Sequence, residues 1–88
     1  MNFNYGVILK KVSDLKIGDE AIVKKIIAKE PVKGRLSAMG IIKGANVKVL
    51  KHTLAKQTWD ILANSTKVGL REEEAKNILV DNMDNKNE

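Results

Sequence analysis

Hydrophobic and polar residues alternate over several short stretches of the chain, and this period is typical of half-buried β-strands. The alternation, together with runs rich in Ile and Val, predicts five short strands over residues 20–27, 45–51, 59–64, 68–70 and 78–80. In the first of these strands the alternation breaks at Lys24 and Lys25. We expect a bend or bulge at this point, because a curled sheet requires one. Asn64 and Ser65 are expected to form the turn that follows the third strand, since Asn tolerates a positive φ.

Residues 31–39 break the strand pattern and predict a short helix. Pro31 suits the first position of a helix, and Gly40 suits the left-handed residue that ends one. Three apolar residues recur at helical spacing and share one face: Val32, Leu36 and Met39. We expect this face to cover the sheet.

The polar residues of this helix, Lys33 and Arg35, are expected to point away from the sheet. Residues 71–77 predict a second helical turn, with Glu72, Glu73 and Glu74 near the positive end of its dipole. The predicted fold is therefore mainly β: a small, partly open barrel of about five strands, with a short helix after the first strand and a helical turn before the last.

The length of 88 residues allows a single domain. We expect an N-terminal extension over 1–11, a folded domain over 12–81 and a disordered acidic tail over 82–88. The apolar segment 3–9 of the extension has two open roles. It is suited to covering an edge of the barrel as an extra strand, and equally to pairing with another chain.

The charge of the chain is unevenly distributed. The net charge is +5; residues 1–71 carry 14 Lys and Arg against 5 Asp and Glu, whereas residues 72–88 carry 2 Lys against 6 Asp and Glu. A basic body of this kind attracts acidic proteins, anionic lipid or nucleic acid. Eight of these residues are expected to form the basic surface: Lys24, Lys25, Lys33, Arg35, Lys43, Lys48, Lys51 and Lys56.

The absence of cysteine excludes disulfides, iron–sulfur clusters and thiol catalysis. A metal site built by the chain alone is not expected, because a tight site needs three or four converging ligands and the chain has a single histidine. We interpret His52 as a surface residue, and Glu72–Glu74 as a solvated helix start. No nucleophile–base pair or phosphate-binding loop occurs, so we expect no enzymatic activity.

Residues 35–44, which read RLSAMGIIKG, resemble the signature of FeoA-type proteins, and the 15–19 and 69–78 segments resemble the opening and ending of that family. The resemblance implies an SH3-like barrel, a fold that also forms the C-terminal domain of iron-dependent repressors. It further implies a cytoplasmic accessory of ferrous iron transport that binds the cytoplasmic G-protein part of the FeoB transporter at the inner face of the membrane. No cofactor is implied beyond weak or borrowed binding of Fe²⁺ or another divalent metal.

Most of the signature has a structural explanation. Leu36 and Met39 are expected to fix the helix on the barrel, while Gly40 and Gly44 allow the chain to turn before and after the 41–43 segment. The recognisable motif therefore predicts the architecture more directly than it predicts a binding site.

The surface residues expected to contact a partner lie outside the apolar face of the helix: Lys33, Arg35, Leu54, Lys56 and Trp59. Leu54 is an apolar residue in a predicted loop, where it has no packing role. Alternation assigns Trp59 to the core, and a position at the rim of the barrel is the other interpretation. The alternative function is a basic barrel that binds RNA or DNA; the chain offers few aromatic residues for stacking on bases, and only two of its 16 basic residues are Arg.

Overall fold

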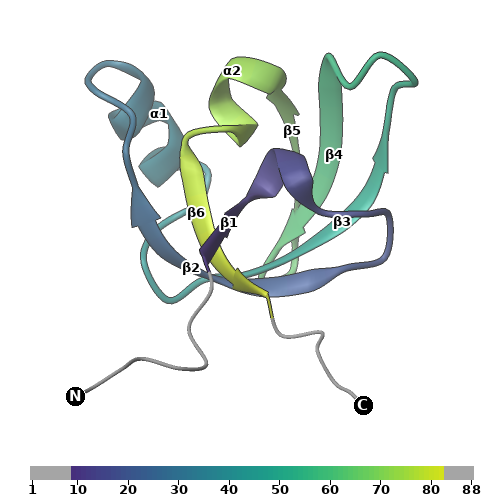
Figure 1. The fold of residues 1–88 in the computed structure, drawn as a ribbon. Coiled ribbons are helices and arrows are strands. Elements are labelled where there is room, and N and C mark those ends of the chain that lie inside the picture. Colours follow the sequence, from purple (N-terminus) through teal and green to yellow (C-terminus); the bar gives the residue numbers. More distant parts are fainter. Residues whose placement is uncertain (1–8, 83–88) are drawn as a thin grey trace, which may run out of the picture.

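Six antiparallel strands form one curled sheet in the computed structural model, which describes residues 9–82 (Figure 1). The strands are β1 (Leu9–Lys11), β2 (Glu20–Ile26), β3 (Asn46–His52), β4 (Thr58–Ala63), β5 (Thr66–Arg71) and β6 (Ile78–Asn82). Their order in the sheet is β1-β6-β2-β3-β4-β5. Among residues 9–82, β1 and β5 are the two edges and do not pair with each other, so the barrel is open as predicted.

The five predicted strands correspond to β2 to β6, and β1 is one strand more. β1 consists of residues that the sequence assigned to the extension, and it pairs with β6 through Leu9↔Asp81 and Lys11↔Leu79. A single 3₁₀ turn, η1 (Val12–Asp14), follows it. Residues 1–8 of the expected extension and residues 83–88 of the expected tail lie outside the described part of the chain. Asn82, the first residue of the expected tail, is the last residue of β6.

The predicted bulge in β2 is confirmed. The register of β2 against β6 shifts between Val23 and Lys25, so that Lys24 has no partner residue in the ladder. A second shift, in β3 between Val49 and Lys51, was not predicted. Bulges strengthen the local twist of a strand, and the two shifts accompany the strong curl of this sheet.

The helix α1 (Val32–Ala38) follows β2 and ends as predicted. Gly40 has φ +88°, and the amides of Gly40 and Ile41 donate to the carbonyls of Ser37 and Leu36, both at 3.0 Å. This pair of bonds is the Schellman motif, in which a left-handed residue satisfies the last carbonyls of a helix. Leu36 is fully buried. The chain therefore leaves α1 through a fixed turn and enters β3 after a second positive-φ glycine, Gly44.

The core lies inside the curl of the sheet and is closed by α1 and by the short helix α2 (Glu72–Ala75). The largest fully buried side chains include Trp59, Leu15, Leu36 and Ile41. Val32 and Met39 are half-buried against this core, which confirms the apolar face predicted for α1. Asn64 has φ 58° in the β4–β5 turn, as expected. Among the described residues, no helix is long and apolar enough to cross a membrane.

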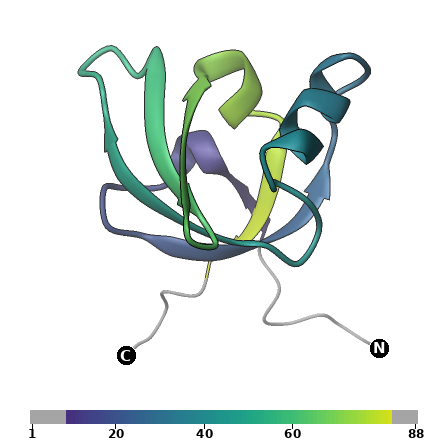
Figure 2. The ribbon, with the colours of Figure 1, turned by 180° about the vertical axis from the view of Figure 1, so that it is seen from behind.

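Both helices and the loop between β3 and β4 lie at the same end of the molecule, with α2 in the middle (Figures 1 and 2). The two views agree on this arrangement. The predicted partner-binding residues of α1 and of the 53–57 loop therefore lie at one end, on either side of α2.

Candidate partner-binding site

The loop between β3 and β4 presents an apolar residue to solvent. Leu54 is completely exposed, at 102% of its reference area. The loop itself is well fixed, because the hydroxyl oxygen of Thr53 accepts the amides of Gln57 at 3.0 Å and Thr58 at 3.3 Å. Lys56 is exposed and has φ 55° in this turn. The structure thus holds Leu54 out from the sheet on an ordered turn.

Trp59 is not part of this surface. It lies in β4 directly below the loop and is fully buried, which confirms the interpretation of Trp59 as a core residue. Its ring lies against that of His52, with 4.6 Å between the ring centroids. Burial therefore leaves no surface of Trp59 for a partner.

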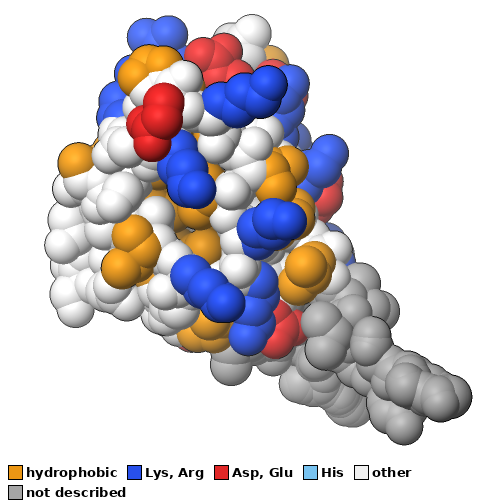
Figure 3. Space-filling model, turned by 90° about the vertical axis from the view of Figure 1, so that its left-hand side faces the viewer, with side chains coloured by type: hydrophobic (Ala, Val, Ile, Leu, Met, Phe, Trp, Pro, Cys, Tyr) orange, Lys and Arg blue, Asp and Glu red, His pale blue; other side chains and the backbone are white. Residues whose placement is uncertain are grey.

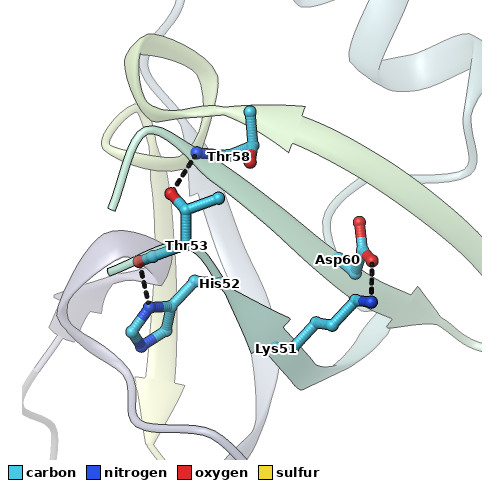
Figure 4. A pocket seen from close by; sticks show the side chains of 5 residues that line it. All are labelled: Lys51, His52, Thr53, Thr58 and Asp60. Carbon is cyan, nitrogen blue, oxygen red and sulfur yellow. Dashed lines mark hydrogen bonds and ion pairs between the residues drawn. The ribbon is translucent and has the colours of Figure 1, made fainter. Parts of the chain in front are cut away.

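A shallow hollow of about 190 Å³ lies beside the same loop, lined by Lys51, His52, Thr53, Thr58 and Asp60 (Figure 4). Its polar groups are already engaged with one another. Nδ1 of His52 lies 2.8 Å from the carbonyl oxygen of Thr53, and Nζ of Lys51 lies 3.7 Å from Oδ2 of Asp60. These contacts stabilise the end of the β3–β4 hairpin, and within residues 9–82 no group of three or more His, Cys, Asp or Glu side chains is placed to hold a metal ion.

Arg35 has a structural partner that the sequence did not reveal. One of its guanidinium nitrogens lies 3.0 Å from Oε2 of Glu74, whose side chain is 8% exposed. Oε1 of the same carboxylate accepts the backbone N–H of Arg71 at 2.9 Å and so caps α2. Glu72 and Glu73 are exposed, as predicted for a solvated helix start, but Glu74 is buried. The prediction of a solvated side chain is wrong for Glu74, because its carboxylate has two charged or hydrogen-bonding partners that replace water.

Four of the predicted basic residues gather at a second hollow, on the other side of α2. Lys24, Lys25, Lys33 and Lys43 line a groove of about 460 Å³ together with Ile26, Ser37, Ile41 and Ile42. We call this set the basic groove. It is formed by the bulged end of β2, by α1 and by the turn that leads to β3. The face shown in Figure 3 carries many Lys and Arg side chains with hydrophobic side chains between them.

The structure therefore divides the predicted partner-binding residues into separate groups. Lys33 belongs to the basic groove, Arg35 to an ion pair with α2, and Leu54 with Lys56 to the loop. Sequence reasoning identified each lysine but not their grouping. The doubled lysine at the break in the alternation was the one available signal, because a bulge places consecutive side chains on the outside of a sheet.

Comparison with known proteins connects this architecture to a family. The family model of the FeoA domain matches residues 10–82. The chain belongs to the FeoA family. A protein of Campylobacter jejuni named "Putative Fe(2+) transport protein A" is 35% identical over 69 residues, which cover 78% of this chain and 93% of that protein. The identification made from residues 35–44 is thereby confirmed.

Solved structures agree with the fold. The FeoA protein of Chlorobium tepidum, solved by NMR, superposes with a TM-score of 0.80 at 31% identity, covering 88% of this chain and 73% of that one. The crystal structure of IdeR from T. acidophilum superposes with a TM-score of 0.76 at 20% identity, covering 92% of this chain but 37% of that one. The SH3-like fold of FeoA proteins therefore also occurs as part of a longer repressor chain, as the resemblance implied.

Proposed function

We propose that this chain, a ferrous iron transport accessory protein of the FeoA family, binds the cytoplasmic G-protein part of a FeoB-type transporter and tunes transport or nucleotide turnover. In this role it acts at the cytoplasmic face of the membrane, and the transporter keeps it there. Fe²⁺ is the cargo of the transporter and not a resident ion of this chain. The chain acts by docking and performs no chemistry itself.

The observation that carries this proposal is the complete exposure of Leu54 on an ordered turn. Exposing a leucine to water is unfavourable, and a fixed position gives a partner a preformed contact with little entropy to lose. A specific interface of standard size covers roughly 600–800 Å² of each partner. The chain has a total surface of 5532 Å², so such an interface would take more than a tenth of it.

Docking is favoured over donation of an arginine to the nucleotide site of the transporter. An arginine finger must reach into the partner with its guanidinium free. The guanidinium of Arg35 is held by Glu74. Arg71, the N-cap residue of α2, is exposed, and it contacts the carboxylate of Glu74 through its backbone N–H. Activation of nucleotide turnover, where it occurs, would then follow from how the docked chain positions the partner.

The alternative function, binding of RNA or DNA, has less support. Proteins that bind single strands stack bases on aromatic side chains. Trp59 is the one Phe, Tyr or Trp residue among residues 9–82, and it is fully buried. The basic surface of the described chain is thus without an aromatic platform.

The test is binding of the full-length chain to the complete transporter from the same organism in lipid nanodiscs. We expect saturable binding that Leu54→Asp weakens about tenfold or more. Ile17→Asp is the matched control, because Ile17 is 57% exposed but lies in the turn before β2, outside the loop and the groove. Absence of binding, or equal effects of the two substitutions, would overturn the proposal, and binding to mixed-sequence RNA that falls steeply with salt would favour the alternative.

A further inference from the structure

The basic groove concentrates positive charge without compensating acids. Three cations elsewhere on the surface have acidic partners: Arg35 pairs with Glu74, Lys48 with Glu20 and Lys51 with Asp60. Other exposed lysines of the described chain, such as Lys67 and Lys76, are in no ion pair but do not line a common groove. Within residues 9–82, no ion pair involves Lys24, Lys25, Lys33 or Lys43, which all line the groove. α1 itself contains no acidic residue, and Glu30, which precedes it, accepts the amide of Gly34 at 3.0 Å. Like charges brought together raise the local potential, so the groove attracts an anionic ligand.

The charge is brought together by the fold and not by a run in the sequence. The bulge in β2 exposes two consecutive lysines, Lys24 and Lys25. Lys33 comes from α1, and Lys43 from the turn between two positive-φ glycines, Gly40 and Gly44. Gly40 and Gly44, which both belong to the signature segment, thus determine where Lys43 lies, and the bulge determines where Lys24 and Lys25 lie. Such a preformed arrangement costs little ordering when a ligand binds.

The floor of the groove is aliphatic. Ile41 is 1% exposed and Ile26 is half-buried against the core, so both belong to the barrel as well as to the groove. Ile42 stands at the rim with 52% of its area exposed. A ligand that fills this groove therefore has to offer aliphatic surface as well as negative charge.

These properties distinguish between classes of anionic ligand. A flat bilayer does not fill a concave hollow, and its headgroups would leave the isoleucine floor uncovered. Lysines alone bind the phosphates of nucleic acid without sequence preference. Recognition of bases and of single strands favours arginine and aromatic side chains, and neither lines this groove. A polypeptide segment with aliphatic side chains between carboxylates matches both the floor and the lysines.

We infer that the basic groove is a docking site for an acidic, aliphatic segment of a partner protein. Under the proposed function that partner is the FeoB-type transporter, and in this respect the inference rests on that function. The groove would then be a second contact in addition to Leu54, and α2 lies between the two (Figures 1 and 2). Charge would guide the encounter, whereas the isoleucines would supply the short-range fit.

The first test uses the ¹⁵N-labelled full-length chain and a short synthetic peptide in which two leucines lie between aspartates and glutamates. We expect saturable shifts that centre on the amides of Ile26, Ser37 and Ile42. A matched peptide with Asn and Gln in place of the acids should bind about tenfold more weakly or not at all. Equal binding of the two peptides, or shifts spread over every exposed lysine, would overturn the inference. Shifts produced by phosphatidylglycerol vesicles but not by the peptide would also overturn the inference.

The second test compares two double variants of equal net charge. Lys33→Glu with Lys43→Glu reverses charge inside the groove, and Lys67→Glu with Lys76→Glu does so at exposed positions that do not line it. The groove variant should lose peptide binding by about tenfold or more while the control retains it. Equal losses would show a general effect of net charge and overturn the inference. Trp59 fluorescence during urea unfolding checks that both variants are folded.

Binding of the same variants to the complete transporter separates the two proposals. A groove variant that loses the peptide and also binds the transporter more weakly supports the inference. Unchanged transporter binding by that variant would overturn the groove as the docking site but leave the proposed function standing. Peptide binding in the groove, combined with no binding of the transporter by the wild-type chain, would overturn the proposed function alone.

Discussion

The guanidinium of Arg35 lies 3.0 Å from the carboxylate of Glu74, and this ion pair connects α1 to α2. The two residues lie beside β5, where Gly69 and Arg71 complete a hollow of about 340 Å³. The ion pair thus links the two helices that lie at the same end of the barrel (Figures 1 and 2). Arg35 is therefore a structural residue of the FeoA signature in this chain as well as a surface cation.

Glu74→Ala should lower the free energy of unfolding by about 2 kcal/mol, because it removes both the ion pair and the cap of α2. Arg35→Ala should cost less, about 0.5–1 kcal/mol, since this side chain is 56% exposed and the cap remains. Urea unfolding followed by Trp59 fluorescence measures both. Glu72→Ala is the control in the same helix and should change the value by less than about 0.5 kcal/mol. Equal effects of Glu72→Ala and Glu74→Ala would contradict this account.

Gly40→Ala should destabilise the protein by about 1 kcal/mol. A Cβ at this position would meet no atom within 4 Å, so the cost comes from the φ of +88° and not from a clash. Gly69→Ala is the matched comparison, because Gly69 lies in β5 and its added Cβ would make an ordinary contact of 3.8 Å with Oδ1 of Asp60. Gly69→Ala should be neutral or stabilising by up to about 0.5 kcal/mol. Gly40→Ala should therefore have the lower midpoint of thermal unfolding. A lower midpoint for Gly69→Ala would refute the assigned role of Gly40.

Leu36→Ala should reduce the free energy of unfolding by about 3 kcal/mol, because the fully buried side chain fixes α1 on the barrel. The same substitution at the fully exposed Leu54 should change stability by less than about 0.5 kcal/mol. Chemical denaturation of Leu36→Ala and Leu54→Ala measures both changes in the free energy of unfolding. A large loss of stability in Leu54→Ala would mean that the loop packs on the barrel, and it would remove the argument for a partner contact at this residue.

The chain alone should bind Fe²⁺ only weakly. Within the described residues no cluster of three metal-binding side chains is present, and His52 faces the carbonyl of Thr53. Anaerobic calorimetry with Fe²⁺ should therefore show no stoichiometric site in the micromolar range. A saturable site that His52→Ala abolishes would contradict this prediction. A metal shared with a partner would appear only when the partner is added.

Local patterns predicted much of the architecture. The bulge at Lys24, the turn at Asn64 and the end of α1 at Gly40 each depend on a few neighbouring residues, and all three are confirmed. An extra strand at an edge of the barrel was one of two roles left open for the extension, and the sequence did not place β1 because all three of its residues are exposed. A strand without a buried face shows no alternation, and its pairing with β6 is a contact between distant parts of the chain.

The candidate site was only partly predictable for the same reason. The exposure of Leu54 follows from an apolar residue in a polar loop, so the sequence indicated it directly. The pairing of Arg35 with Glu74 and the grouping of Lys24, Lys33 and Lys43 depend on how α1 packs beside α2 and β2. The sequence did not predict the capping role of Glu74, because the N-cap residue of α2 is Arg71 and not the Ser or Thr that usually marks a capping box.

The extra residue in β2 has a consequence for how this family can vary. Val23 pairs with Val80 and Lys25 with Leu79, so the ladder to β6 would remain continuous if Lys24 were deleted. The deletion would remove one lysine and also straighten the strand that carries the next one. Curvature and charge are thus encoded at a single position. A homologue that has lost this residue would keep its sheet and its core, yet its groove would hold less positive charge.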